Sequence, residues 1–270
     1  MGKVIFILSD GLRYDTAVAG MGFLGHLVEA RLATLYKVVG ELPSISRPMY
    51  ETSQTGLPSS EHGIVSNAIV RRSTKPNVFQ CAVQAGKITA AAAYWWFSEL
   101  YNHAPYDRIQ DREVDDDSLL IQHGRFYTED EFPDVDLFAT AGMLARRFRP
   151  HYLLLHPMGM DYAGQTFGAD SPQYRTHATR QDAWLAPYLT EWLSDGYTIL
   201  VTGDHGMNVD GHHGGTTADV REVPLYLMYP DRPGKGDTGQ VISQLRIAPT
   251  LCSLLGVPIP ESMKHPPLDE

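Results

Sequence analysis

The fold is decided by Lys3-Val4-Ile5-Phe6-Ile7-Leu8-Ser9-Asp10-Gly11, near the start of the chain. Apolar residues occupy consecutive positions from Val4 to Leu8 instead of alternating with polar ones. That pattern is typical of a strand buried on both faces of a parallel sheet. An acidic residue, Asp10, follows at once. Because open α/β sheets place their chemistry beyond the carboxyl ends of their strands, the stretch predicts a central strand with a site at its end.

Similar apolar runs recur along the chain, with helical patterns between them. They predict strands at 35–39, 87–92, 152–156, 197–202 and 223–228, the last at a sheet edge because Pro224 lacks an N–H. Helices are expected at 26–35, from Tyr50 onward, and at 137–148, 173–193 and 244–255. Strands that alternate with helices predict an α/β fold with a mostly parallel central sheet and helices on both faces.

The chain is long enough to form one large domain. With 270 residues and 43% hydrophobic content, we expect a single domain over residues 1–270. The acidic, irregular stretch 107–134 predicts a small cap or lid within 95–135, and a solvated surface excursion is the alternative. Cys81 and Cys252, the two cysteines, are expected to be reduced packing thiols.

Charge and hydropathy exclude several classes of protein. The formal net charge of −10 excludes a protein that coats nucleic acid, since such proteins carry a basic face. A small phosphorylated substrate remains compatible, because bound cations reverse the local field. No run approaches the ~20 apolar residues of a membrane helix, and the first residues do not read as a secretory signal. We therefore expect a cytoplasmic protein without a membrane contact, whose oligomeric state the sequence leaves open.

Acidic and histidine residues gather in short segments of the predicted loops. Asp204 and His205 follow a buried strand, and His212 and His213 lie between glycines a few residues later. Asp161 is followed four residues on by Gln165, a spacing that puts both side chains on one face if the segment is helical, whereas Gly164 permits a tight loop instead. Oxygen and imidazole ligands from several loops suit a divalent metal site. The alternatives are a helix N-cap for Asp10 and solvated loop histidines.

The order of these segments resembles the type I phosphodiesterase/nucleotide pyrophosphatase branch of the alkaline phosphatase superfamily. The matching segments span nearly the whole chain: 9–13 (SDGLR), 43–48 (PSISRP), 55–64 (TGLPSSEHGI), 161–164 (DYAG), 202–207 (TGDHGM), 213–214 (HG) and 247–251 (IAPTL). The resemblance implies an alkaline phosphatase-like fold and two divalent metal ions, Zn²⁺ being expected and Mn²⁺ or Mg²⁺ the alternatives. It implies that Ser46 is the nucleophile, although Ser44 is a second loop hydroxyl nearby.

The resemblance also implies which residues bind the ions. One ion would be held by Asp10, Ser46, Asp204 and His205, and the other by Asp161, residue 165 and His213. The family carries a histidine at the position of Gln165, whose amide is a weaker ligand than imidazole. The missing nitrogen could come instead from His156 or His212.

A second departure concerns phosphate binding. Met49 stands where the nucleotide pyrophosphatases carry an asparagine, and Arg47 adjoins Ser46. Because a guanidinium binds phosphoryl oxygens through two parallel hydrogen bonds, Arg47 is a candidate substrate-binding residue.

The sequence thus predicts a metal-dependent hydrolase that cleaves phosphodiester or pyrophosphate bonds through a phosphorylated Ser46. The substrate would be a small phosphorylated molecule, for example a nucleotide. One alternative is a phosphomonoesterase, phosphonate hydrolase or sulfatase on the same fold, although the C/S-x-P-x-R signature of sulfatases is absent. The other is a non-catalytic binding protein with a degraded second metal site, as the presence of Gln165 suggests.

Overall fold

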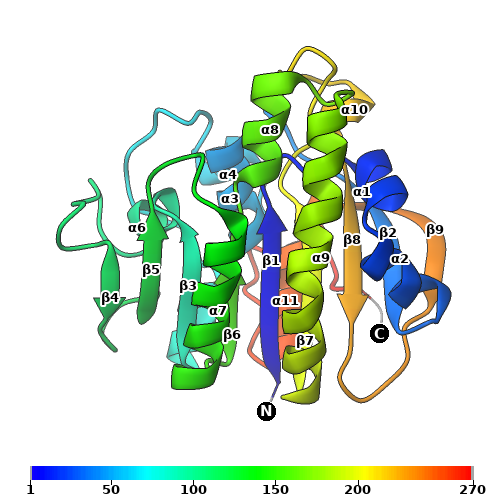
Figure 1. The fold of residues 1–270 in the computed structure, drawn as a ribbon. Coiled ribbons are helices and arrows are strands. Elements are labelled where there is room, and N and C mark those ends of the chain that lie inside the picture. The colour runs from blue at the N-terminus through cyan, green and yellow to red at the C-terminus, as the bar shows by residue number, and fades with distance from the viewer. Residues whose placement is uncertain (1, 269–270) are drawn as a thin grey trace.

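The computed structural model describes residues 2–268, which form one nine-stranded sheet with helices on both faces (Figure 1). Across the sheet the strands lie in the order β4-β5-β3-β6-β1-β7-β8-β2-β9. Their bounds are β1 (Lys3–Ser9), β2 (Ala33–Val39), β3 (Thr89–Tyr94), β4 (Glu113–Asp115), β5 (His123–Tyr127), β6 (Tyr152–Leu155), β7 (Tyr197–Gly203), β8 (Glu222–Met228) and β9 (Gly236–Ser243). Strands β5, β3, β6, β1 and β7 run parallel to one another.

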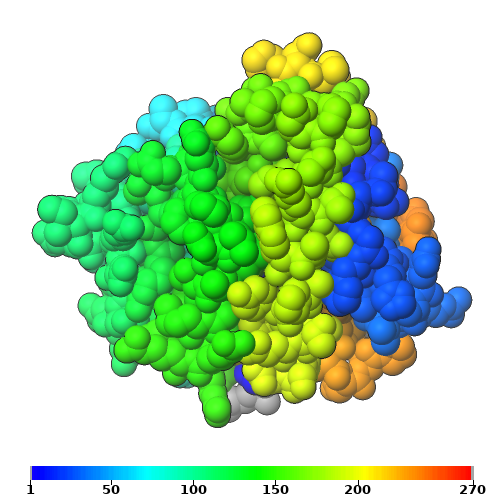
Figure 2. All heavy atoms as spheres, viewed as in Figure 1, coloured from blue at the N-terminus to red at the C-terminus, as the bar shows by residue number. Residues whose placement is uncertain are grey.

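Two layers of helices cover this sheet. Their bounds are α1 (Tyr14–Gly20), α2 (Gly22–Glu29), α3 (Ser46–Thr55), α4 (Ser59–His62), α5 (Val78–Gln84), α6 (Trp96–Tyr101), α7 (Asp134–Phe148), α8 (Gly159–Phe167), α9 (Pro172–Ser194), α10 (Ala218–Arg221) and α11 (Ile247–Leu255). Figure 2 shows α7 and α9 covering the near face of the sheet. Helices α3, α5, α6 and α11 contribute to the core on the far face.

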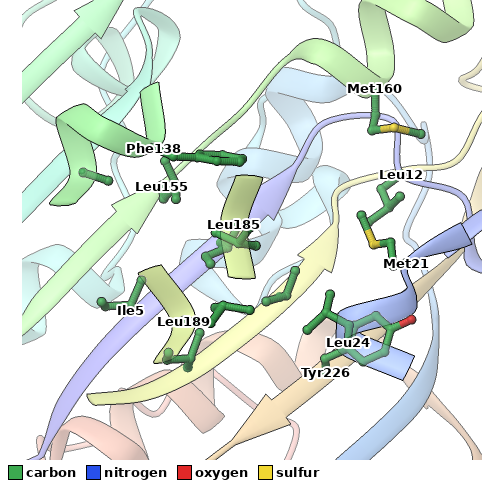
Figure 3. Close-up of a cluster of buried hydrophobic side chains, with 14 of the residues drawn as sticks. Ile5, Leu12, Met21, Leu24, Phe138, Leu155, Met160, Leu185, Leu189 and Tyr226 are labelled. Carbon is green, nitrogen blue, oxygen red and sulfur yellow. The ribbon is translucent and has the colours of Figure 1, made fainter. Parts of the chain in front are cut away.

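Strand β1 lies at the centre of the sheet and contributes to both cores. Ile5 and Ile7 pack into the core beneath α7 and α9, whereas Val4 and Phe6 pack into the opposite core. Figure 3 shows Ile5 of β1 near Leu189 of α9, within the first of these cores. A strand that is buried on both sides must be apolar at every position, so the predicted α/β fold is confirmed.

The register of the central strands brings their carboxyl ends to one edge. Ile7 of β1 pairs with Leu155 of β6 on one side and with Val201 of β7 on the other. The residues that follow these three strands therefore come together at the same edge.

Two predicted elements differ in the structure. The helix expected at 26–35 is wrong in position, because α2 ends at Glu29 and β2 already begins at Ala33. Arg31 adopts a φ of 55°, which breaks the helical path. Helix α3 also begins earlier than expected, at Ser46 instead of Tyr50.

The strand at 223–228 is internal and is not the last strand. Strand β8 pairs with β7 and with β2, and β9 forms the edge. Pro224 is tolerated because the β7–β8 register ends at the Thr202–Leu225 pair, so the proline lies beyond the last paired residue on that side.

The segment for which we expected a cap or lid, 95–135, contributes α6, β4 and β5. Both strands pair at the edge of the main sheet, β5 parallel to β3 and β4 antiparallel to β5. Cys81 and Cys252 are buried and free. Among residues 2–268, none of the helices combines the length and apolar character needed to cross a membrane.

Candidate metal and phosphoryl-transfer site

Four segments that lie far apart in the sequence meet at the carboxyl edge of the central strands. Asp10 follows β1, Asp204–His205 follows β7, and Ser46 begins α3. Asp161 lies in the first turn of α8, which packs against the loop after β1. A Cβ atom on Gly11 would lie 2.8 Å from the Cα of Asp161, and the φ of Gly11 is +71°. Glycine at position 11 therefore permits the close approach of these two segments.

The first group of candidate ligands is Asp10, Asp204 and His205, which are all fully buried. Their ligand atoms lie within 4.8 Å of one another. The backbone N–H of Gly11 donates to Asp204 Oδ1 at 3.0 Å. Asp204 Oδ2 has no hydrogen-bond partner although it is buried, and it faces His205 Nε2 at 3.4 Å.

The imidazole of His205 is oriented for ligation. Its Nδ1 lies 2.8 Å from the carbonyl oxygen of Gly206, which can only accept, so Nδ1 carries the proton. Its Nε2 faces inward, 3.2 Å from Asp10 Oδ1. A hydrogen bond of this kind on the second nitrogen is the usual arrangement of a metal-binding histidine.

Ser46 is the hydroxyl that reaches this group. Its Oγ lies 3.2 Å from His205 Nε2 and 3.4 Å from Asp10 Oδ1, and the residue is 5% exposed. Ser44 is turned elsewhere, since its Oγ donates to the carbonyl oxygen of Gly215 at 3.0 Å. The structure thus places the hydroxyl of Ser46, and not that of Ser44, beside the first group.

A second group shares His205 with the first and adds Asp161 and His213. His213 Nδ1 lies 3.3 Å from the carbonyl oxygen of Ser44, and Nε2 lies 3.6 Å from Asp161 Oδ1. The rings of His205 and His213 stack with their centroids 3.9 Å apart. The two groups are thus contiguous, as a two-metal site requires.

Gln165 lies beside the second group on the next turn of α8. Its Nε2 donates to Asp161 Oδ2 at 2.6 Å and lies 3.5 Å from His213 Nε2. In this arrangement the amide is a hydrogen-bond donor to a candidate ligand. The two histidines proposed as substitutes lie elsewhere, because His212 is exposed and His156 lies against Asp10. Besides His213, the histidine whose ring nitrogen lies near Asp161 is His205.

The electrostatics of these residues fit a cation. Asp161 Oδ1 and Asp204 Oδ2 are buried without a hydrogen-bond partner, and a buried unpaired carboxylate is unfavourable. Burial and the charge of Asp10 raise the pKa of Asp204 to about 7 and hold the pKa of Asp161 well above its usual range. Burial lowers the pKa of His205, but the carboxylates around it have the larger combined effect and raise it to about 10. Divalent ions bound between these carboxylates would relieve the repulsion between their negative charges.

The net shift of the His213 pKa is in the opposite direction to that of His205. Burial and the neighbouring His205 lower its pKa to about 4, so its imidazole is neutral near pH 7. A neutral imidazole is the form that binds metal ions.

Arg47 does not act as expected from the sequence. Its guanidinium is 1% exposed, pairs with Glu99 at 2.8 Å, and donates to the carbonyl oxygen of Ile69 at 2.8 Å. It also lies 4.5 Å from the ring of Trp96. Successive helical residues point about 100° apart, so when Ser46 faces the acidic groups, Arg47 faces α6. The predicted contact between Arg47 and a phosphoryl group is therefore replaced by a structural role.

Tyr50, which was not predicted to contact the site, and His156, which was a candidate only for the second group, both approach Asp10. The hydroxyl of Tyr50 donates to Asp10 Oδ2, and His156 Nε2 lies 3.3 Å from the same oxygen. Tyr50 follows Ser46 by four residues, the spacing that puts two side chains on one helical face. That spacing was the available signal, provided that α3 was known to begin at Ser46.

Gln165→His is expected to tighten the second group. Wild-type protein should bind one equivalent of Zn²⁺ tightly and a second more weakly, because an imidazole is a better zinc ligand than an amide. The variant should bind the second equivalent at least about tenfold more tightly. Titration of chelator-treated protein with Zn²⁺ measures both constants. Gln165→Ala is the matched control, and it should weaken or leave unchanged the second equivalent. Two equally tight equivalents in the wild type, unchanged in Gln165→His, would contradict this expectation.

The sequence matches a known protein family over most of its length. The family described as type I phosphodiesterase/nucleotide pyrophosphatase matches residues 4–213. This range contains every candidate ligand named above.

Curated relatives are larger proteins. GPI ethanolamine phosphate transferase 3 of Schizosaccharomyces pombe is 36% identical over 113 residues, which cover 40% of this chain and 12% of the relative. The catalytic subunit of the human GPI ethanolamine phosphate transferase 3 is 25% identical over 96% of this chain and 25% of its own length. The chain thus spans about a quarter or less of these relatives.

Solved structures share the fold. Murine ectonucleotide pyrophosphatase/phosphodiesterase 5, in an inactive form in complex with AMP, superposes with a TM-score of 0.74 at 16% identity over 96% of each chain. A phosphonate monoester hydrolase from Silicibacter pomeroyi gives a TM-score of 0.65 at 16% identity, covering 99% of this chain and 76% of the hydrolase.

Proposed function

The chain belongs to the type I phosphodiesterase/nucleotide pyrophosphatase family, and from that premise we propose that it is a metal-dependent enzyme that cleaves phosphodiester or pyrophosphate bonds with Ser46 as nucleophile. The observation that carries the proposal is the position of Ser46 Oγ, 3.2 Å from His205 Nε2 and 3.4 Å from Asp10 Oδ1. A serine hydroxyl is a weak nucleophile, and a position among metal ligands is one at which a bound ion would activate it.

The metal complement is part of the same proposal. Asp10, Asp204, His205 and Ser46 would hold one divalent ion, and Asp161 and His213 would hold a second beside it. When bound, such ions supply positive charge that lowers the pKa of a hydroxyl and neutralises phosphoryl oxygens. Mixed carboxylate and imidazole ligands favour Zn²⁺, with Mn²⁺ as the alternative.

The chemistry proposed for Ser46 runs in two steps. Its oxygen attacks phosphorus, the bond from phosphorus to the leaving alcohol or phosphate breaks, and the leaving oxygen departs with a proton. The oxygen of a second nucleophile then bonds to phosphorus, the bond between phosphorus and Ser46 Oγ breaks, and the proton given up by the nucleophile restores the hydroxyl of Ser46. Burial of Ser46 limits access of bulk water to the first step.

The second nucleophile distinguishes two candidate activities. Water gives a hydrolase, whereas the hydroxyl of another molecule gives a transferase. The curated relatives are named as ethanolamine phosphate transferases, and this favours a phosphodiester with an ethanolamine substituent as a second candidate substrate class. The two activities share the attack by Ser46 and differ in the acceptor.

A panel of aryl esters tests the proposal. Chelator-treated protein should be inactive, and added Zn²⁺ or Mn²⁺ should restore turnover of bis(p-nitrophenyl) phosphate. This diester should be turned over at least about tenfold faster than p-nitrophenyl phosphate or p-nitrophenyl sulfate at equal concentration. A preference for the monoester or sulfate would support the alternative hydrolases. Metal binding without turnover of any ester, including glycerophosphoethanolamine with a diol acceptor, would support a non-catalytic binding protein.

A further inference from the structure

The two oxygens of Asp10 have different surroundings. Oδ1 faces the candidate reaction centre, 3.4 Å from Ser46 Oγ and 3.2 Å from His205 Nε2. Oδ2 faces away from that centre. It accepts a hydrogen bond from the hydroxyl of Tyr50, and it lies 3.3 Å from His156 Nε2. The carboxylate is fully buried.

Tyr50 is fixed in the orientation that makes this contact. Its ring stacks on Phe97 with centroids 4.5 Å apart and meets the edge of His156 at 4.6 Å. The side chains of all three residues are fully buried. Since Ser46 and Tyr50 are one turn apart on α3, the helix that carries the nucleophile also carries the group that orients Asp10.

His156 is held from its other side. Tyr127 donates its hydroxyl proton to the carbonyl oxygen of His156 at 2.7 Å, and the same hydroxyl lies 3.4 Å from His156 Nδ1. His156 Nε2 has no hydrogen-bond partner of good geometry and lies nearest to Asp10 Oδ2. Both neighbours of Oδ2 are therefore fixed by the surrounding core.

We propose that Tyr50, with the support of His156, is a positioning residue that restricts Asp10 to a single metal-binding oxygen and so favours zinc over manganese. The inference rests on the proposed function, because it concerns the ion next to Ser46. With Oδ2 engaged, the first group offers one oxygen each from Asp10, Asp204 and Ser46 and one nitrogen from His205. Four such ligands suit Zn²⁺, whereas Mn²⁺ prefers more oxygen ligands.

Tyr50→Phe tests this directly, because it removes the hydroxyl and keeps the ring. Orienting groups behind a metal ligand typically contribute 10- to 100-fold in affinity. The variant should therefore bind its tight Zn²⁺ equivalent at least about tenfold more weakly, while Mn²⁺ affinity changes less and the zinc-to-manganese ratio falls. Competition with a chromogenic chelator measures both constants without reference to activity.

Tyr152→Phe is the matched control. Tyr152 is also fully buried, and its hydroxyl donates to Gln54 Oε1 at 2.9 Å, away from the candidate ligands. It should lose stability comparable to that lost by Tyr50→Phe and keep the wild-type metal affinities. Zinc affinity of Tyr50→Phe within about twofold of both wild type and Tyr152→Phe would overturn the inference.

If Tyr50→Phe does not fold, two variants of His156 test whether the groups at Asp10 Oδ2 control zinc affinity. His156→Leu should weaken zinc binding, and His156→Gln, which restores an N–H donor near Oδ2, should recover part of the affinity. Equal zinc affinities in these two variants would overturn the inference. Failure of this inference is distinguishable from failure of the proposed function. The proposed function would fail if the wild-type protein bound no metal or if Ser46→Ala kept full activity.

Discussion

Ser46→Ala is expected to lose at least about 10³-fold in turnover of bis(p-nitrophenyl) phosphate while folding normally and still binding metal. The reason is that the variant removes the oxygen that forms the covalent bond to phosphorus. It leaves Asp10, Asp204 and His205 unchanged, so the first group of candidate ligands persists. Steady-state kinetics, thermal unfolding and metal analysis of the same preparation measure the three properties.

Ser44→Ala is the control for this prediction. Ser44 lies two residues earlier, and its hydroxyl donates to the carbonyl oxygen of Gly215. Its loss should cost about 1 kcal/mol of stability, the usual net value of one hydrogen bond, and leave most of the turnover. Full activity in Ser46→Ala together with inactivity in Ser44→Ala would move the nucleophile to Ser44. A phosphorylated residue trapped with radiolabelled substrate should likewise map to Ser46 and disappear in Ser46→Ala.

Asp204→Asn is expected to lose both metal and rate. An amide replaces a charged candidate ligand whose Oδ2 is buried without a hydrogen-bond partner, so zinc affinity at the tight site should fall at least about 100-fold. Turnover at micromolar zinc should fall with it. Titration with Zn²⁺ and kinetics at several zinc concentrations separate weaker binding from slower chemistry. Zinc stoichiometry and affinity unchanged in Asp204→Asn would remove this residue from the set of metal ligands.

Although Asp204→Asn should weaken metal binding, the metal-free variant should be more stable at pH 8 than the metal-free wild-type protein. Burial and Asp10 raise the pKa of Asp204 from 3.8 to about 7, so the folded metal-free protein disfavours its charged form. Its contribution to stability is present below pH 3.8 and is lost as the pH rises through about 7. At pH 8 the metal-free variant should therefore unfold at a higher temperature than metal-free wild type. Asp182→Asn is the control. Burial raises the pKa of Asp182 as well, but both of its carboxylate oxygens accept hydrogen bonds from the backbone N–H groups of Phe23 and Leu24, so this substitution should not raise the unfolding temperature.

Some features of the fold followed from the residues themselves. The consecutive apolar residues of β1 and β7 predicted central strands, because a strand covered on both faces must be apolar at each position. The helix at 26–35 was misplaced because its end depends on the backbone conformation of Arg31, which residue type alone rarely specifies. Strand β8 is internal because β2 pairs on its other side, a long-range pairing that residue type does not specify. The edge beyond β2 is formed by β9, a polar and half-exposed strand whose pattern resembles that of a loop.

The candidate site, like the fold, was predicted in part from residue types and in part only from the structure. The chemical types and the order of Asp10, Asp161, Asp204 and His205 are properties of the sequence, and they sufficed for the resemblance to the family. Only the resemblance to the family favoured Ser46 over Ser44, since residue type and local pattern do not distinguish two loop-adjacent hydroxyls of the same kind. That choice depends on the rotation of α3, which turns Ser46 toward His205 and Arg47 toward Glu99.

The sequence by itself therefore determined a central β1 followed by Asp10 and the chemical types of the candidate ligands, because burial and ligand chemistry depend on residue identity. Only the tertiary structure decided that His205 lies within reach of both groups, that Gln165 donates to Asp161, and that Tyr50 donates to the far oxygen of Asp10. These are relations between side chains from different segments of the chain. Their geometry is set by the register of β6, β1 and β7 and by the packing of α3 and α8 on that sheet, and no local pattern encodes it.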